Sequence, residues 1–187
     1  MAMNAREAIW GKARTEPKIY LHWTAGKYES CFSDYHINIT GDGDIYVSTE
    51  DLSETLSHTW RRNSGSVGIA LCCGYGAGST SLGSYPPTAK QIEVMAQVIR
   101  VVADALWLTI DKVHVLTHGE AANNEDGDNS YHNPYAWWND SYRDGDTRGD
   151  LEYLGTTESP CYKPWATDGS RGGDVLRGKA NWYRNNG

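Results

Sequence analysis

Two short apolar runs, far apart in the chain, each end on a histidine that precedes small residues. The first covers residues 19–22 and the second covers residues 113–118, and both are rich in apolar and β-branched side chains. Runs of this length and composition predict buried β-strands. His22 and His118 would then lie at the ends of two separate strands. This placement indicates a metal site whose ligands are brought together by the fold.

The rest of the pattern predicts an α/β fold. Further strands are expected near residues 35–39, 44–47, 55–58 and 67–72, with a hairpin turn at residues 40–43. One helix should begin at Thr88, where Thr88 and Gln91 have capping-box spacing and the apolar residues that follow recur every three or four positions. A last helix is expected over residues 174–184. Since no repeat or linker divides the chain, we predict one domain over residues 1–187, with a single mixed β-sheet flanked by helices.

A metal site needs a third ligand. His114 is excluded because four residues of a strand span about 13 Å, too far for His114 and His118 to share one ion with bonds of about 2 Å. Asp150 stands out, since Arg148 lies two residues before it and would share its side of an extended segment. Two histidines and one carboxylate would leave a zinc position open, as in catalytic sites. Composition alone does not choose among the candidates after His118, which are His132, Asp140, Asp144, Asp146, Asp150 and Cys161.

Five short motifs resemble, in order, those of the zinc-dependent N-acetylmuramoyl-L-alanine amidases of the amidase type 2 family. This family shares its fold with peptidoglycan recognition proteins and the phage lysozyme-amidases. The motifs are His-Trp-Thr-Ala-Gly at 22–26, Tyr-His-Ile-Asn-Ile with Gly-Asp-Gly within 35–43, Ser-His-Thr, Asn and Ser-Val-Gly-Ile within 57–69, His-Gly-Glu at 118–120 and Arg-Gly-Asp at 148–150. Any one of them alone would be a weak signal, but their common order is specific.

The resemblance implies hydrolysis of the amide between N-acetylmuramic acid and L-alanine in peptidoglycan. Zinc would be held by His22, His118 and Asp150. Tyr35 would position the attacking water or donate to the developing oxyanion, and Arg148 would stabilise its negative charge. An arginine does not deprotonate in proteins, so Arg148 cannot be the base.

The other site residues each have an alternative structural interpretation. Glu120 is a candidate for proton transfer, but the sequence favours a role in supporting a ligand or capping a loop. Some family members carry a catalytic glutamate where this chain has Ala70, which favours Tyr35 as the polar catalytic group. Core packing is as plausible for Trp23 as a groove wall, and His36 is expected to be structural. The predicted substrate-binding residues are Trp23, His58 and Asn63.

Charge and hydropathy restrict the partners. The net charge is −7 and no basic stripe is present, which argues against nucleic acid and leaves peptidoglycan or a muropeptide as the expected substrate. The N-terminal residues lack the apolar core of a signal peptide, and no later stretch is long and apolar enough to span a membrane. We therefore expect a protein made in the cytoplasm, either a phage or prophage endolysin that reaches the wall after release or a muropeptide-recycling amidase. A non-catalytic peptidoglycan-binding module is the alternative, and the oligomeric state is not set by the sequence.

Four cysteines are present and none forms a Cys-x-x-Cys motif. Cys72 and Cys73 continue an apolar run and are expected to be buried thiols. The sequence does not decide whether Cys31 and Cys161 form a disulfide.

Overall fold

The protein is built on a five-stranded mixed sheet. A computed structural model describes residues 4–13, 16–59, 62–128 and 149–187. The strand order is β3-β2-β4-β1-β5. The β1–β4, β1–β5 and β2–β4 pairs are parallel, and β3 is antiparallel to β2 at one edge. The strands are β1 (Lys18–Trp23), β2 (Ile37–Ile39), β3 (Ile45–Val47), β4 (Ser66–Leu71) and β5 (Val115–Thr117).

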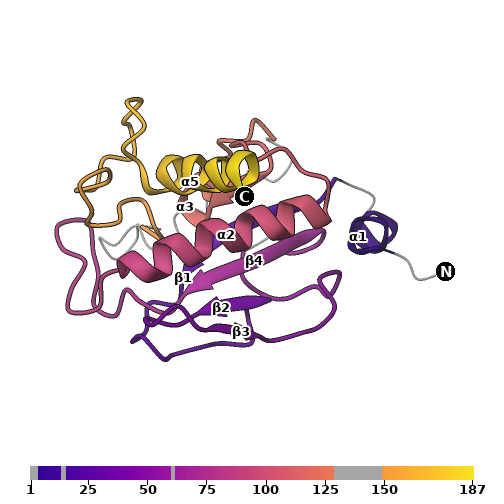
Figure 1. Ribbon diagram of the computed structural model, residues 1–187, viewed down its shortest axis with the longest axis horizontal. Helices are drawn as coiled ribbons and strands as arrows, with labels where there is room; N and C mark the ends of the chain where they lie inside the picture. Colours follow the sequence, from indigo (N-terminus) through magenta and orange to yellow (C-terminus); the bar gives the residue numbers. More distant parts are fainter. Residues whose placement is uncertain (1–3, 14–15, 60–61, 129–148) are drawn as a thin grey trace.

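Helices flank this sheet, as predicted. Helix α2 lies across one face, and α5 packs beside α2 and reaches β5 (Figure 1). The predicted capping box is present, because Thr88 Oγ1 accepts from Gln91 N at 3.0 Å and Gln91 Oε1 accepts from Thr88 N at 2.9 Å. The helices are α1 (Ala5–Ala13), α2 (Ala89–Ala105), α3 (His118–Ala122) and α5 (Gly172–Asn186). None of the helices in the described part of the chain has the length and apolarity needed to cross a bilayer.

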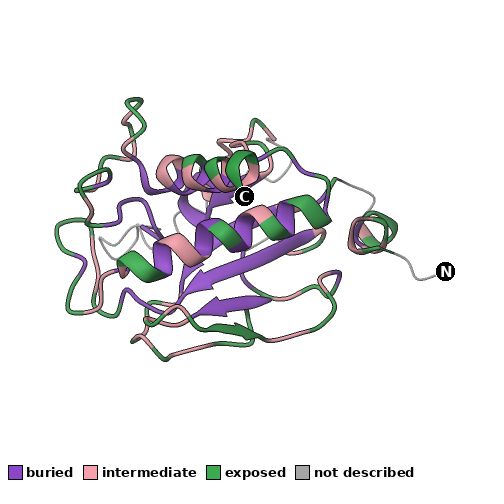
Figure 2. Ribbon diagram, viewed as in Figure 1, coloured by how far each residue is buried: buried purple, intermediate pink, exposed green. Residues whose placement is uncertain are grey.

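The two faces of the sheet have different characters. Successive strand residues point to opposite faces, and β1 divides accordingly. Ile19, Leu21 and Trp23 belong to the main core that contains α2, whereas Tyr20 packs in a second cluster with Leu116 and Ala121. Figure 2 shows β2 and β4 as buried along their lengths, and β1 is buried except at its first residue. His22 therefore shares the face of Tyr20, opposite the α2 layer, near the carboxyl end of its strand.

Three local predictions differ from the structure. Residues 55–58 form no strand, because the His58 and Thr59 amides donate to Asn63 Oδ1 (3.0 and 2.6 Å) instead of to a neighbouring strand. Helix α1 was not predicted, since its apolar pattern is weak and only Ile9 is buried. Helix α3 begins directly after β5, where a loop was expected.

A buried ion cluster ties β1 to the segment after α3. The Asp126 carboxylate accepts from Arg62 at 2.7 and 3.2 Å and from Lys18. Arg62 also donates to Tyr20 Oη at 3.1 Å and to Asn124 Oδ1 at 2.7 Å. Burial alone would raise the pKa of Asp126, but the hydrogen bonds from Arg62 and Lys18 outweigh it and lower this pKa to about 2.

This cluster predicts an acid-sensitive fold. Because the pKa of Asp126 is lower in the folded protein than in the unfolded chain, its stabilisation is present above about pH 4 and is lost as the pH falls toward 2. We expect the free energy of unfolding to fall by about 1–2 kcal/mol over that range, after solvent screening is allowed for. Urea unfolding of the wild type and Asp126→Asn at several pH values measures it. The Asp126→Asn variant should lose this part of the pH dependence of the free energy of unfolding, and the exposed Asp42→Asn variant should keep it. The same pH dependence in all three proteins would contradict the assignment.

Candidate metal centre

Two histidines meet where parallel strands end side by side. His22 is the second-to-last residue of β1, and His118 is the first residue of α3, directly after β5. The β1–β5 register pairs Leu21 with Thr117, so the residue that follows each is His22 or His118. The two Nδ1 atoms lie 3.1 Å apart, and both side chains are buried. The predicted strand ends thus bring these two histidines together.

Asp150 completes a three-residue cluster. Its Oδ2 lies 3.6 Å from His22 Nδ1 and 3.7 Å from His118 Nδ1, and all three residues are buried. Ligands at about 2.0–2.1 Å in a tetrahedral zinc site are about 3.3–3.4 Å from one another. The separations of 3.1, 3.6 and 3.7 Å bracket that spacing. Three such donors on so small a triangle could hold one metal ion, and their mixture of imidazole and carboxylate suits zinc.

The segment that carries Asp150 is held by the start of α5. Leu151 adopts a left-handed conformation with φ of 60°, which is uncommon for a residue other than glycine. Arg171 donates to both Glu152 oxygens (3.0 and 2.9 Å), and Gly172 N donates to the Glu152 carbonyl at 2.9 Å. A Cβ atom on Gly172 would lie 1.6 Å from the Leu151 carbonyl oxygen, so only glycine permits this close approach.

Electrostatics keep the carboxylate of the cluster charged. Burial by itself would raise the pKa of Asp150, but hydrogen bonds and charge from His118 and His22 bring it far below its usual range. Behind the cluster, burial lowers the pKa of His58 well below that of a free histidine, and the neighbouring His22 and His36 lower it further. The centre therefore offers an ionised carboxylate, with a neutral imidazole behind it.

Tyr35 and Ala70 lie beside His22. The Tyr35 ring is 5.0 Å from the His22 ring between centroids, and its hydroxyl donates to the Trp23 carbonyl across a long 3.4 Å. Ala70 is the β4 residue in register with His22. The neighbouring position that would carry a glutamate therefore offers only a methyl group, and Tyr35 is the polar catalytic candidate that the structure does place at the cluster.

Of the three predicted substrate-binding residues, Trp23 packs on the α2 side of the sheet and His58 on the side of His22. Trp23 is 9% exposed and packs against Gly74. His58 is 7% exposed, with its ring 5.2 Å from that of His22. Asn63 caps the turn that carries His58. Thr59 belongs to the Ser-His-Thr motif but was given no role there, and its hydroxyl lies 3.2 Å from His22 Nε2 and 2.9 Å from His58 Nδ1.

Glu120 is engaged with α5. Its carboxylate accepts two bonds of 2.8 Å from Arg177, and its Oε1 also accepts from Thr117 N at 2.9 Å. Thr117 Oγ1 in turn accepts from Glu120 N, which makes the pair the capping box of α3. The Arg177 hydrogen bonds outweigh burial and lower the pKa of Glu120. Of the roles that the sequence suggests for Glu120, the geometry favours that of a helix cap.

The remaining candidates divide into those placed elsewhere and those outside the described residues. His114 Nδ1 lies 2.7 Å from Asp111 Oδ1, away from the cluster. Cys161 is exposed and Cys72 and Cys73 are buried, while Cys31 Sγ lies 3.4 Å from Cys72 Sγ and not against Cys161. Arg148, His132, Asp140, Asp144 and Asp146 lie outside the described residues.

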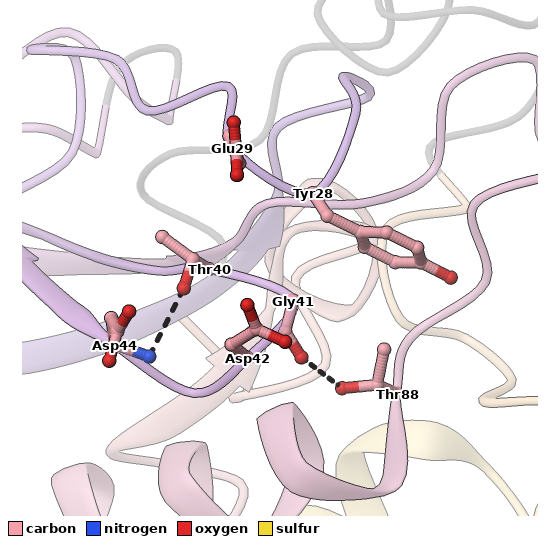
Figure 3. Close-up of a pocket in the computed structure, with 7 residues that line it drawn as sticks. All are labelled: Tyr28, Glu29, Thr40, Gly41, Asp42, Asp44 and Thr88. Atoms are coloured by element: carbon pink, nitrogen blue, oxygen red, sulfur yellow. Dashed lines mark hydrogen bonds between the residues drawn. The ribbon is translucent and has the colours of Figure 1, made fainter.

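A separate pocket of about 470 Å³ opens beyond the end of β2 (Figure 3). Thr88 donates to the Gly41 carbonyl at 2.8 Å across it, and Asp44 N donates to Thr40 Oγ1 at 3.1 Å. Its acidic residues, Glu29, Asp42 and Asp44, include none of the cluster's ligands. The seven lining residues are Tyr28, Glu29, Thr40, Gly41, Asp42, Asp44 and Thr88.

Solved structures with some similarity to the chain come from phages, bacteria and insects. The endolysin of Thermus scotoductus MAT2119 bacteriophage Ph2119 is 18% identical, with 57% of this chain and 73% of that chain covered and a TM-score of 0.44. The N-acetylmuramoyl-L-alanine amidase LysC from Clostridium intestinale is 18% identical (57% and 72% covered, TM-score 0.42). The Drosophila peptidoglycan recognition protein SD is 17% identical (56% and 69% covered, TM-score 0.42).

Comparison with sequences gives a firmer result. No curated protein matches the sequence significantly. The family described as N-acetylmuramoyl-L-alanine amidase matches residues 12–133, more than half of the 187 residues. The matched region contains His22 and His118, which the fold brings within 3.1 Å. The chain therefore belongs to the N-acetylmuramoyl-L-alanine amidase family.

Proposed function

We propose that this protein is a zinc-dependent amidase that cleaves peptidoglycan between N-acetylmuramic acid and L-alanine. The observation that carries the proposal is the buried cluster of His22, His118 and Asp150, whose three ligating atoms lie within 4.8 Å of one another, in a chain that belongs to the amidase family. A zinc ion bound there would supply Lewis-acid catalysis of amide hydrolysis. Residues from α1 to α5 share one hydrophobic core, which supports a single amidase domain over residues 1–187.

The chain's own groups would prepare the reaction. The two imidazoles direct Nδ1 toward the Asp150 carboxylate, which is ionised, and this set leaves room for a substrate or water as a further ligand. Tyr35 would exchange its long bond to the Trp23 carbonyl for one to the scissile carbonyl oxygen as negative charge develops there. For Arg148 we retain the sequence-based proposal that its charge stabilises the same oxygen.

Product analysis tests the proposed reaction. Zinc-loaded protein is incubated with purified sacculi and, separately, with soluble muropeptides, and the products are identified by mass spectrometry. Peptides with a free N-terminal alanine are expected, and chelator-treated protein should release none until zinc is restored. New reducing sugar ends without such peptides would indicate a glycosidase, and binding without cleavage would indicate a recognition module. Preference for sacculi would assign an endolysin, and preference for muropeptides a recycling enzyme.

The role of Tyr35 predicts a loss of rate without a loss of metal. Tyr35→Phe keeps the ring against His22 and removes only the hydroxyl. We expect kcat to fall about 100-fold, as for other single oxyanion donors, with zinc content unchanged. Tyr28→Phe, which removes a hydroxyl bound to the Pro86 carbonyl, is the matched control and should keep its rate. An unchanged kcat in Tyr35→Phe would remove Tyr35 from the mechanism.

A further inference from the structure

A line of hydrogen-bonding groups leads from His22 away from the metal cluster. The far ring nitrogen of His22, Nε2, lies 3.2 Å from Thr59 Oγ1 and 3.3 Å from His58 Nδ1. Thr59 Oγ1 lies 2.9 Å from His58 Nδ1, and His58 Nε2 lies 3.3 Å from Ser66 Oγ. Ser66 Oγ lies 2.8 and 2.9 Å from the carbonyl oxygens of Arg62 and Asn63. All four side chains are buried.

The carbonyl oxygens of Arg62 and Asn63 determine which group donates and which accepts in each hydrogen bond of this line. A carbonyl oxygen can only accept, so the single hydroxyl proton of Ser66 is donated to Arg62 or Asn63. Ser66 Oγ must then accept from His58, which places the His58 proton on Nε2 and leaves a lone pair on Nδ1. Thr59 donates to that lone pair and is left as an acceptor. Both described groups within hydrogen-bond distance of His22 Nε2, Thr59 Oγ1 and His58 Nδ1, are therefore acceptors.

We propose that Ser66, His58 and Thr59 form a relay that fixes His22 in the tautomer with its proton on Nε2, so that the Nδ1 lone pair is held ready for the metal. The three are positioning residues and do not touch the substrate. A ligating histidine whose other nitrogen donates to a fixed partner binds metal more tightly, typically by about 10–100-fold. The metal half of this inference rests on the proposed function, whereas the tautomer can be observed in metal-free protein.

Packing holds the relay in place. The His58 ring lies against Gly68, where an added Cβ atom would be only 2.7 Å from it, so β4 approaches the ring as closely as glycine allows. Asn63 Oδ1 accepts from the His58 and Thr59 amides and fixes the turn that carries both. His36 packs edge-on against His58 and is itself fixed, since its Nδ1 accepts from Gly68 N and its Nε2 donates to the Glu54 carbonyl. His58 therefore has little freedom to turn over.

Ser66→Ala tests the relay at its far end, because the hydrogen bonds of Ser66 Oγ in the described part of the chain reach His58, Arg62 and Asn63 and none of the cluster's ligands. Without the hydroxyl, nothing dictates which His58 nitrogen carries the proton, and His22 should populate both tautomers. In wild-type protein, long-range ¹H–¹⁵N NMR of the imidazoles, recorded without metal at alkaline pH, should show His22 and His58 protonated on Nε2. In Ser66→Ala, the His22 signals should shift toward a mixture, and zinc affinity measured by chelator competition should fall about 10-fold.

Two further variants separate the relay from loss of stability. Ser53→Ala removes another buried serine hydroxyl, one that is bonded to Asp51 at 2.6 Å and is no part of the relay, and should change neither the tautomer nor zinc affinity. Ser66→Thr keeps the hydroxyl and should restore both. A wild-type His22 protonated on Nδ1, or a Ser66→Ala protein with wild-type tautomer or affinity, would overturn the proposal. If the wild type shows the expected tautomer but binds no zinc, the zinc-dependent function fails and the tautomer assignment stands.

Discussion

Asp150→Ala is expected to abolish high-affinity zinc binding and amidase activity together. The substitution removes one of the three ligating atoms, the carboxylate oxygen that faces two imidazoles 3.1 Å apart. Loss of a group that merely supports a ligand costs about 10–100-fold in metal affinity, so loss of a ligand should cost more than 100-fold. Chelator competition gives the zinc affinity, and release of peptides with N-terminal alanine gives the activity.

The matched control for this experiment is Asp168→Ala. Asp168 is an exposed carboxylate in the same C-terminal stretch, bonded to Ser170. Its removal should leave zinc affinity and activity unchanged. If Asp150→Ala kept wild-type zinc affinity, the third ligand would have to be another residue, and Cys161 or His132 would be tested next.

Glu120→Ala is expected to lower the free energy of unfolding strongly. The molecules that remain folded should keep their catalytic rate. The substitution leaves the Arg177 guanidinium, 6% exposed as a residue, with Asp174 as its remaining carboxylate partner. It also removes the α3 capping box. Loss of one member of a buried ion pair costs about 3–5 kcal/mol, and we expect a loss of that size in the free energy of unfolding. Urea unfolding measures it, and kcat per zinc-loaded molecule should stay within about twofold of wild type.

Glu93→Ala provides the comparison on the surface. Glu93 pairs with Lys179 at 2.8 Å, but its side chain is 42% exposed, so its loss should cost less than about 1 kcal/mol. A catalytic Glu120 would give the opposite result, with a fall in kcat of about 100-fold or more and little change in stability. That outcome would return Glu120 to the role that the sequence first suggested.

Local patterns in the sequence predicted a mixed sheet, helix α2 and the meeting of the two histidines. The strand to His22 and the helix from Thr88 are specified by short-range periodicity and capping, which are properties of consecutive residues. The same rule would have found α3, because Thr117 and Glu120 have the spacing of Thr88 and Gln91. Glu120 is a candidate site residue because it follows His118, and its contacts are those of the cap that the sequence favours.

The substrate-binding roles of Trp23, His58 and Asn63 stay a prediction. Trp23 lies on the α2 side of β1 and His58 lies beside His22, and both are buried. Alternation along a strand tells which residues share a face, but not what covers that face. The turn at residues 58–63 packs there because Gly68 lets the His58 ring approach β4 and because Asn63 satisfies two backbone amides. These are tertiary contacts that no local pattern encodes.

The contact between Gly172 and the Leu151 carbonyl has a consequence for the order in which the protein matures. During synthesis both histidines and every strand of the sheet leave the ribosome before Arg171 and Gly172 exist, since chains grow from the N-terminus. Until those two residues dock on Glu152 and Leu151, the turn that presents Asp150 lacks its contacts with α5. We therefore expect a nascent chain to bind metal tightly only after translation has passed the start of the last helix.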